Sequence, residues 1–295
     1  MNLSNFGMDS ITLAGPLESK LAASKAAGFS QIMLWAKDLA CHPGGLHEAV
    51  RVVRASGVRV TGIQVMRDYE GLSDSLHDYK LDIARHMLQV CKAVGAPLLM
   101  VCSSTSSHAS ADMALIAHHL AKLANLAVPL GIKVGFEALS WGRHINQFGQ
   151  SWEAVDMADH ANLGVVLDSF HMLANQADLD GLAEIPSHKI ALVQLSDFMW
   201  RDIRSAEERL ETARHLRVFP GEGAHSQELS DLLRRLDRGG YRGDYSFEVF
   251  NDDYLQLSPD IVARRAHASA KWVTDQVLRR SLQVLQRTER HATMA

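Results

Sequence analysis

The sequence predicts a single closed (β/α)₈ barrel, the TIM barrel, and three observations lead to that fold class. Short β-branched or apolar runs alternate eight times with longer segments of helical period, the pattern of a parallel sheet with crossover helices. The chain has 295 residues, somewhat more than the roughly 250 of a typical barrel. The first expected strand is followed by no GxGxxG motif, which an open, doubly wound sheet normally carries. We therefore expect one barrel domain over residues 1–295.

The expected strands are the short runs rich in β-branched and apolar residues. Such runs, bounded by glycine, proline or polar residues, are typical of strands buried in a parallel sheet. In chain order they are Ser10–Ala14, Gln31–Trp35, Val58–Val65, Leu98–Cys102, Lys133–Glu137, Gly164–Asp168, Ile190–Gln194 and Tyr245–Val249.

The expected helices lie between these strands, and several of them end in a glycine just before the next strand. Gly28, Gly57, Gly95 and Gly131 occupy positions where a helix end favours a left-handed residue. The charged tail from about residue 279 is expected to be helical. The helical segments are Leu17–Ala27, Leu46–Ser56, Tyr79–Val94, Ala111–Leu130, Trp152–Ala158, Leu179–Ile185, Ser226–Arg238 and Pro259–Leu282.

Composition excludes several classes of function. Lys and Arg total 30 against 34 for Asp and Glu, a balance that disfavours a nucleic-acid-binding protein. The chain begins with no basic and apolar leader and contains no run of ~18 uninterrupted apolar residues, so we expect no membrane segment. Cys41, Cys91 and Cys102 are scattered and odd in number, which disfavours disulfides and thiolate zinc and favours the cytoplasm.

Four consecutive expected strands, the last half of the barrel, deliver an oxygen-bearing side chain where they end. They are Glu137, Asp168, Gln194 and Glu248. Functional groups of such barrels lie at the carboxyl ends of the strands, where these side chains would converge. Any one of them could instead cap a helix or pair with an arginine. Together, three carboxylates and an amide oxygen suit a hard divalent cation, Mg²⁺ or Mn²⁺ with Co²⁺ tolerated, and predict a metal site.

Histidines and arginines near these strand ends are the candidates for proton transfer and substrate binding. His171 follows Asp168 by three residues and is the first candidate for a catalytic base; His144 is the second. Arg67 and Arg217 lie in segments expected on the same face, where a guanidinium would bind a substrate carboxylate or phosphate. Either arginine could also be a surface charge. The adjacent pair His118 and His119 lies in a helical segment and is expected on the exterior.

Four motifs carry a resemblance to a known family. They are EALSWGRHINQFGQSWEAVDMADHANLGVVLDSFHML, VQLSD, RVFPGEG and SFEVFND. Over residues 10–275 the chain resembles the xylose isomerase-like TIM barrel superfamily, and within it the bacterial 3-dehydroshikimate dehydratases. The resemblance implies that Glu137, Asp168, Gln194 and Glu248 hold a divalent metal. Many epimerases of the superfamily have histidine where this chain has Gln194.

The resemblance also implies an activity and a substrate. It implies a lyase that dehydrates 3-dehydroshikimate to protocatechuate in quinate and shikimate catabolism, with a small carboxylate as its binding partner. Arg67 lies in RDYEG, where that branch commonly has RDFEG, and Arg217 precedes FPG as in the branch. The segment 198–216, expected as a loop, departs from the family. A sugar isomerase or epimerase, or an enzyme resembling inosose dehydratase, would use the same metal set and stays the alternative; the oligomeric state is left open.

Overall fold

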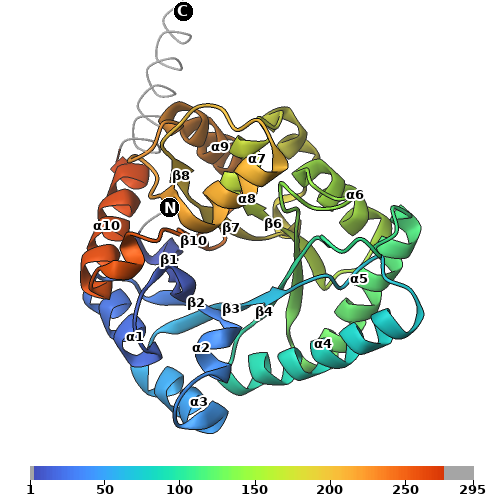
Figure 1. Ribbon diagram of the computed structural model, residues 1–295, viewed down its shortest axis with the longest axis horizontal. Coiled ribbons are helices and arrows are strands. Elements are labelled where there is room, and N and C mark those ends of the chain that lie inside the picture. The colour runs from blue at the N-terminus through green and yellow to red at the C-terminus, as the bar shows by residue number, and fades with distance from the viewer. Residues whose placement is uncertain (1–2, 276–295) are drawn as a thin grey trace, which may run out of the picture.

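Eight parallel strands form the closed barrel in the computed structural model, which describes residues 3–275 (Figure 1). The strand order around the barrel is β1-β10-β7-β6-β5-β4-β3-β2, so each strand lies beside its neighbours in sequence. The predicted fold class is thereby confirmed. The strands are β1 (Phe6–Asp9), β2 (Gln31–Trp35), β3 (Arg59–Met66), β4 (Leu98–Cys102), β5 (Lys133–Glu137), β6 (Leu163–Asp168), β7 (Ile190–Leu195) and β10 (Tyr245–Phe247).

The first strand lies earlier in the chain than predicted. It is β1, Phe6–Asp9, whereas the predicted range Ser10–Ala14 begins with a 3-10 turn, η2 (Ser10–Thr12). β1 is short and contains Gly7, whose Cα lies so close to Gln31 that a Cβ would meet that side chain at 2.7 Å. This close approach requires glycine, and glycine is uncommon in strands. The sequence of this segment therefore indicates a strand only weakly. The shift makes Asp9 the last residue of a barrel strand.

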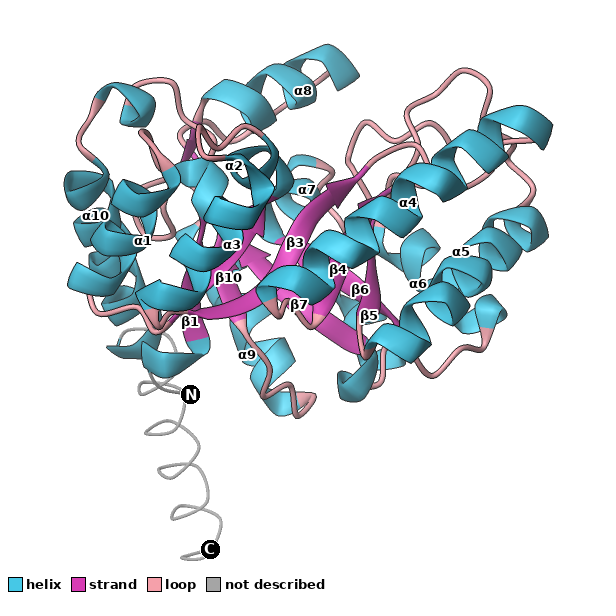
Figure 2. Cartoon of the chain, turned by 90° about the horizontal axis from the view of Figure 1, so that it is seen from below, coloured by secondary structure: helices cyan, strands magenta, loops and turns pink. Residues whose placement is uncertain are grey.

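The outer layer consists of helices that follow the strands (Figures 1 and 2). Gly28, Gly57, Gly95 and Gly131 all have positive φ, from 69° to 92°, as predicted. The helix predicted over Leu179–Ile185 is instead a 3-10 helix, η4 (Leu179–Glu184), and the tail predicted from about 279 lies outside the described residues. The ring helices are α1 (Leu17–Ala26), α3 (Gly45–Ser56), α4 (Asp74–Val94), α5 (Met113–Ala127), α6 (Phe148–Ala158), α9 (Ser226–Arg238) and α10 (Pro259–Trp272).

Helix α5 and the following turn η3 (Val128–Leu130) form the most apolar helical segment among the described residues. By length and composition alone, the 18 residues Met113–Leu130 could cross a membrane. Their buried side chains pack on β5 and against the neighbouring helix α6. This packing in the outer layer of the barrel accounts for the apolar length.

Additional elements lie over the carboxyl ends of the strands. They are the short helices α2 (Ala36–Ala40) and α7 (Ser169–Ala174), the helix α8 (Ala206–His215), and an antiparallel pair of β8 (Asp197–Phe198) and β9 (Arg217–Val218). The segment 198–216, expected as a loop, therefore contains a helix, whose first turn is capped by the Ser205 hydroxyl. Its sequence AEERLETARH is mostly charged, so it has little of the apolar stripe by which a helix is predicted. Figure 2 shows α8 at one end of the barrel.

Candidate active site and metal centre

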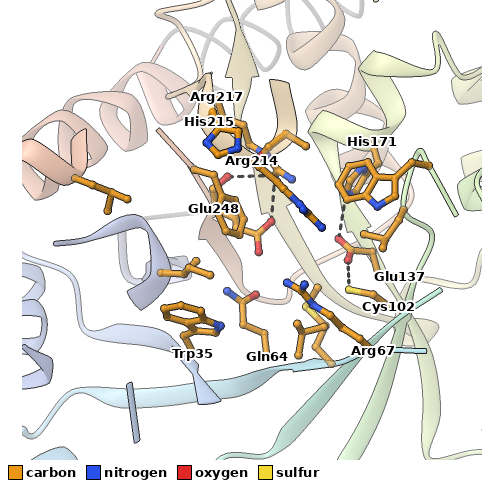
Figure 3. A pocket seen from close by; sticks show the side chains of 18 of the residues that line it. Trp35, Gln64, Arg67, Cys102, Glu137, His171, Arg214, His215, Arg217 and Glu248 are labelled. Carbon is orange, nitrogen blue, oxygen red and sulfur yellow. Dashed lines mark hydrogen bonds and ion pairs between the residues drawn. The ribbon is translucent and has the colours of Figure 1, made fainter. Parts of the chain in front are cut away.

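A cavity of about 690 Å³ opens at the end of the barrel where the strands terminate. Strand ends and the segments after them supply its walls, and Figure 3 shows side chains from both halves of the barrel pointing into one space. The residues labelled there are Trp35, Gln64, Arg67, Cys102, Glu137, His171, Arg214, His215, Arg217 and Glu248.

Three polar residues from two neighbouring strand ends form a compact buried cluster. Glu137 ends β5, Asp168 ends β6, and His171 lies one helical turn after Asp168 in α7. One ligand atom from each lies within 4.8 Å of the others. Parallel pairing sets Asp168 beside Gln194 of β7, and Glu248 follows directly after β10. The four oxygen-bearing residues predicted at strand ends therefore lie at one end of the barrel.

Arg217 joins two of the predicted metal ligands. Its Nη1 donates to Asp168 Oδ2 at 2.7 Å and to Glu248 Oε2 at 3.1 Å, and its Nε donates to the backbone oxygen of Ala213 at 2.9 Å. The guanidinium carbon lies 4.5 Å from the ring centre of Phe170, and the side chain is only 2% exposed. Arg217 thus lines the cavity but is already engaged by the carboxylates. Its predicted contact with substrate stays a prediction.

Two buried oxygens of the predicted ligands have no hydrogen-bond partner among the described residues. They are Glu137 Oε1 and Gln194 Oε1. The other atoms of both groups are occupied, since Cys102 Sγ donates to Glu137 Oε2 at 2.9 Å and Gln194 Nε2 donates to Asp9 Oδ2 at 2.7 Å. A buried polar atom without a partner is costly, and a bound cation removes that cost. The residues present therefore fit a divalent metal ion with oxygen ligands.

The crowded carboxyl groups shift one another's ionisation. Burial, with the nearby charge of Asp168, raises the pKa of Glu137 to about 8, and burial raises the pKa of Asp9 to about 7. Burial also raises the pKa of Glu248 well above its ordinary value. For Asp168 the effect of burial is outweighed by Arg217, which lowers its pKa. Arg217 alone does not neutralise this set, and a divalent cation would add the missing positive charge.

His171 reaches the cluster, whereas His144 does not. His171 Nε2 lies 3.6 Å from Asp168 Oδ2 and 3.9 Å from Glu137 Oε1. Its Nδ1 accepts the backbone N–H of Ser140 at 3.1 Å, so the neutral ring carries its proton on Nε2. Burial lowers the pKa of His171 to about 3 and keeps the ring neutral. His144 contacts the backbone oxygen of Ala109 at 2.9 Å and is not part of the cavity wall.

The cavity wall also carries two guanidinium groups that take no part in the ion pairs of the carboxylate cluster among the described residues. Arg67 and Arg214 both line the cavity, and within the described range neither side chain has a hydrogen-bond or ion-pair partner. In Figure 3 they approach the cavity from different sides. Asp68, next to Arg67, accepts the backbone N–H of Thr105 at 2.7 Å and so ties this segment to the end of β4.

Sequence reasoning predicted Arg67 but missed Arg214, Asp9 and Gln64. Arg214 is carried by α8, the helix that was expected as a loop, and Asp9 ends the strand that was misplaced. Gln64 lies inside the predicted third strand and its Oε1 accepts from Gln194 Nε2 at 3.1 Å. A buried-strand position near the carboxyl end of β3, occupied by an amide between Ile63 and Val65, was the signal that could have identified Gln64.

Comparisons with known proteins agree with this architecture. The model of the xylose isomerase-like TIM barrel family matches residues 21–276. The chain is 37% identical over 244 residues to a 3-dehydroshikimate dehydratase of Pseudomonas aeruginosa. That alignment covers 83% of this chain but only 38% of the relative, so the chain spans well under half the length of that enzyme.

Two solved structures are similar in fold. A xylose isomerase-like TIM barrel/4-hydroxyphenylpyruvate dioxygenase fusion protein superposes with a TM-score of 0.88 at 32% identity, over 96% of this chain and 44% of that one. The IOLI protein, whose structure contains a zinc atom, superposes with a TM-score of 0.80 at 20% identity, over 93% of this chain and 99% of that one. The second likeness establishes the fold.

Proposed function

The chain belongs to the xylose isomerase-like TIM barrel family, and from this premise we propose that it is a divalent-metal-dependent dehydratase acting on 3-dehydroshikimate. The observation that carries the proposal is the buried oxygen set with its two unpartnered oxygens, beside a cavity wall with unpaired guanidinium groups. The 37% identity to a 3-dehydroshikimate dehydratase supports the choice of substrate. The product would be protocatechuate, formed with loss of one water molecule.

The metal would be held by Glu137, Asp168, Gln194 and Glu248. Oxygen ligands of this kind suit Mg²⁺, Mn²⁺ or Co²⁺, and the zinc atom in the IOLI structure supports a divalent ion in this fold. A bound ion would supply Lewis acidity toward the oxygens of the ketone and of the neighbouring hydroxyl. The hydrogen on the carbon that carries this hydroxyl would then be more acidic.

The substrate carboxylate would be bound by Arg67, with Arg214 as a second contact. Both guanidinium groups line the cavity without an ion-pair partner in the described part of the chain, whereas Arg217 is held by Asp168 and Glu248. A guanidinium can form two parallel hydrogen bonds to a carboxylate, so it binds and orients such a substrate. Once its carboxylate is held by the guanidinium, the substrate ring would be fixed in one orientation.

The reaction requires removal of a hydrogen from carbon and departure of a hydroxyl group. In 3-dehydroshikimate the carbon next to the ketone carries a hydrogen and a hydroxyl, and the following carbon carries the leaving hydroxyl. Loss of that hydrogen and that hydroxyl forms a second double bond and releases water. Migration of a ring hydrogen to oxygen then completes the aromatic ring, which makes the overall reaction strongly downhill.

His171 would serve this reaction as a neutral hydrogen-bond donor. Because Ser140 N–H occupies Nδ1, the ring proton is held at Nε2, on the side that faces Asp168 and the cavity. A neutral imidazole in such a position can polarise a substrate oxygen without changing charge. This proposal replaces the sequence prediction of His171 as base, and it leaves the carboxylates of the same wall, Glu137 first, as acceptors of the proton.

The test is product formation by the purified protein. With Mn²⁺ and 3-dehydroshikimate we expect protocatechuate, followed by ultraviolet absorbance and identified by chromatography, and none after exhaustive chelation. His171→Gln, which retains an N–H donor, should keep more activity than His171→Ala if the ring is a donor. Absence of protocatechuate, together with interconversion of a ketose pair or of inososes, would establish the isomerase alternative instead.

The scattered free cysteines also support a location for the protein. Cys41, Cys91 and Cys102 are all unpaired, and Cys91 and Cys102 are buried. We propose on this basis that the protein works in the reducing cytoplasm.

A further inference from the structure

Asp9 contacts one of the predicted metal ligands, Gln194. It ends β1 and is fully buried, and in the barrel order β10 is the neighbour of β1 and β7 is the strand after β10. Ser246 of β10 donates its hydroxyl to Asp9 Oδ1, and Gln194 of β7 donates Nε2 to Asp9 Oδ2 at 2.7 Å. Both carboxylate oxygens of Asp9 are therefore occupied by protein donors.

The Gln194 amide has two ends of nearly equal shape, and only its oxygen can bind a cation. Its nitrogen donates to Asp9 Oδ2 and to Gln64 Oε1 at 3.1 Å, which leaves Oε1 buried and without a partner. If the Gln64 amide is turned end for end, it donates to Glu248 Oε1 at 2.9 Å and to Asp9 Oδ2 at 3.2 Å. In that orientation the Gln64 nitrogen also lies 3.1 Å from Gln194 Nε2, so Asp9 Oδ2 is the acceptor that holds the nitrogen end of the Gln194 amide.

We propose that Asp9 is a positioning residue that holds the Gln194 amide with its oxygen toward the divalent cation. The inference rests on the proposed metal site. Asp9 Oδ1 accepts from the Ser246 hydroxyl and Asp9 Oδ2 accepts from Gln194 Nε2, so Asp9 selects the nitrogen end of the amide. Without it the amide can turn and present its NH₂ group, which repels a cation. Partners that orient metal ligands in this way typically change metal affinity about 10- to 100-fold.

The dependence on Gln194 separates this role from direct ligation. Asp9 contacts the Gln194 amide, whereas Glu137 Oε1 and Gln194 Oε1 are the buried oxygens without a hydrogen-bond partner among the described residues. Asp9 instead acts through Gln194, so its contribution must disappear when Gln194 is removed. This dependence can be measured as a coupling between two substitutions.

The experiment is a double-mutant cycle on Mn²⁺ affinity, measured by calorimetry and by the electron paramagnetic resonance of unbound Mn²⁺. Asp9→Ala should weaken binding by about 10- to 100-fold. The double variant of Asp9→Ala with Gln194→Ala should bind no more weakly than Gln194→Ala alone. As a matched control, Asp197→Asn changes a fully buried carboxylate that contacts His225 away from the cavity and should bind Mn²⁺ like the unaltered protein.

Each of the remaining outcomes contradicts either the positioning role of Asp9 or the proposed metal site. Unchanged affinity in Asp9→Ala, or the same further loss in the Gln194→Ala background, overturns the positioning role while the metal site stands. No Mn²⁺ binding by the unaltered protein overturns the proposed function itself. If Asp9→Ala does not fold, Asp9→Ser serves the same cycle, because its hydroxyl is one bond shorter and remains beside Ser246.

Discussion

At the scale of single residues, the site is governed by how buried charges are compensated. Arg217 stands between Asp168 and Glu248, with its Nη1 within 3.1 Å of a carboxylate oxygen of each. Removing one partner of such a buried pair leaves the other charge uncompensated, which costs more than the pair contributes. Arg67 has no ion-pair partner among the described residues, so its guanidinium is available to bind the substrate carboxylate.

Substitutions of Arg67 and of Arg217 are therefore expected to have different effects. Arg67→Ala should lower kcat/KM about 10- to 100-fold, mainly through KM, because it removes a charge-assisted contact to the substrate carboxylate. Arg67→Lys should restore only part of this loss, since a lysine cannot form the paired bonds. Arg214→Ala should have the same kind of effect, and steady-state kinetics with varied substrate would measure all three.

Arg217→Ala is the contrasting variant. It should weaken Mn²⁺ binding or the folded state itself, because Asp168 and Glu248 lose their shared counter-charge. A pure increase in KM for Arg217→Ala, with no change for Arg67→Ala, would show that the sequence prediction for Arg217 is right and the assignment to Arg67 is wrong.

At the scale of secondary-structure elements, the contact between α4 and α5 contains two buried histidines. His77 of α4 and His119 of α5 stack with ring centres 3.6 Å apart. His119 was expected on the exterior with its neighbour His118, but it is buried, and its Nδ1 has no partner among the described residues. The prediction was wrong because a histidine pair in sequence occupies two different sides of a helix.

This contact should make stability depend on pH. Burial lowers the pKa of His119 to about 4, below the ordinary 6.5 that it regains on unfolding. Between these values the unfolded chain binds more protons, so stability is full above pH 6.5 and falls as pH decreases toward 4. His119→Leu should flatten that decrease, as measured by urea unfolding of the metal-free protein at several pH values.

A control from the same helix pair isolates the effect of burial. His86→Leu replaces an exposed histidine of α4 that takes no part in the contact between His77 and His119, and it should keep the pH dependence of the unaltered protein. An unchanged slope in His119→Leu would contradict the assignment of the pH effect to this contact.

At the scale of the whole molecule, barrel closure forces like charges together. Glu137, Asp168 and Glu248 come from three strand ends, and closure adds Asp9 from β1. The same closure buries these carboxyl groups and brings them together, and burial first, with neighbouring carboxylates second, raises the pKa of Glu137 and of Glu248. A divalent ion in this position would bind the folded chain far better than the unfolded one.

Metal binding should accordingly stabilise the fold. At a free Mn²⁺ concentration of 100 times the dissociation constant, the free energy of unfolding should rise by about 2.7 kcal/mol. Glu248→Gln should remove most of this gain, because an amide is a weaker ligand than a carboxylate, and the metal-free variant should stay folded because Arg217 keeps its ion pair with Asp168. Thermal unfolding with Mn²⁺ and with chelator measures both; an equal gain in Glu248→Gln would exclude Glu248 as a ligand.

Sequence patterns alone were enough to predict the barrel and the four oxygen-bearing residues at strand ends. Both depend on local patterns, since apolar alternation sets the elements and parallel strands end on one face. Glycines at helix ends were predictable for the same reason: Gly57 and Gly95 each need a left-handed backbone where they stand.

The other residues of the site come together through contacts between distant elements of the folded chain. Asp9 reaches Gln194 because barrel closure brings β1 within reach of β7, and 185 positions separate the two residues along the chain. Arg214 reaches the cavity because the charged helix α8 folds over the mouth. Contacts of this kind depend on distances between elements, which no periodicity within one element encodes, and so they also decided that Arg217 pairs with Asp168 and Glu248.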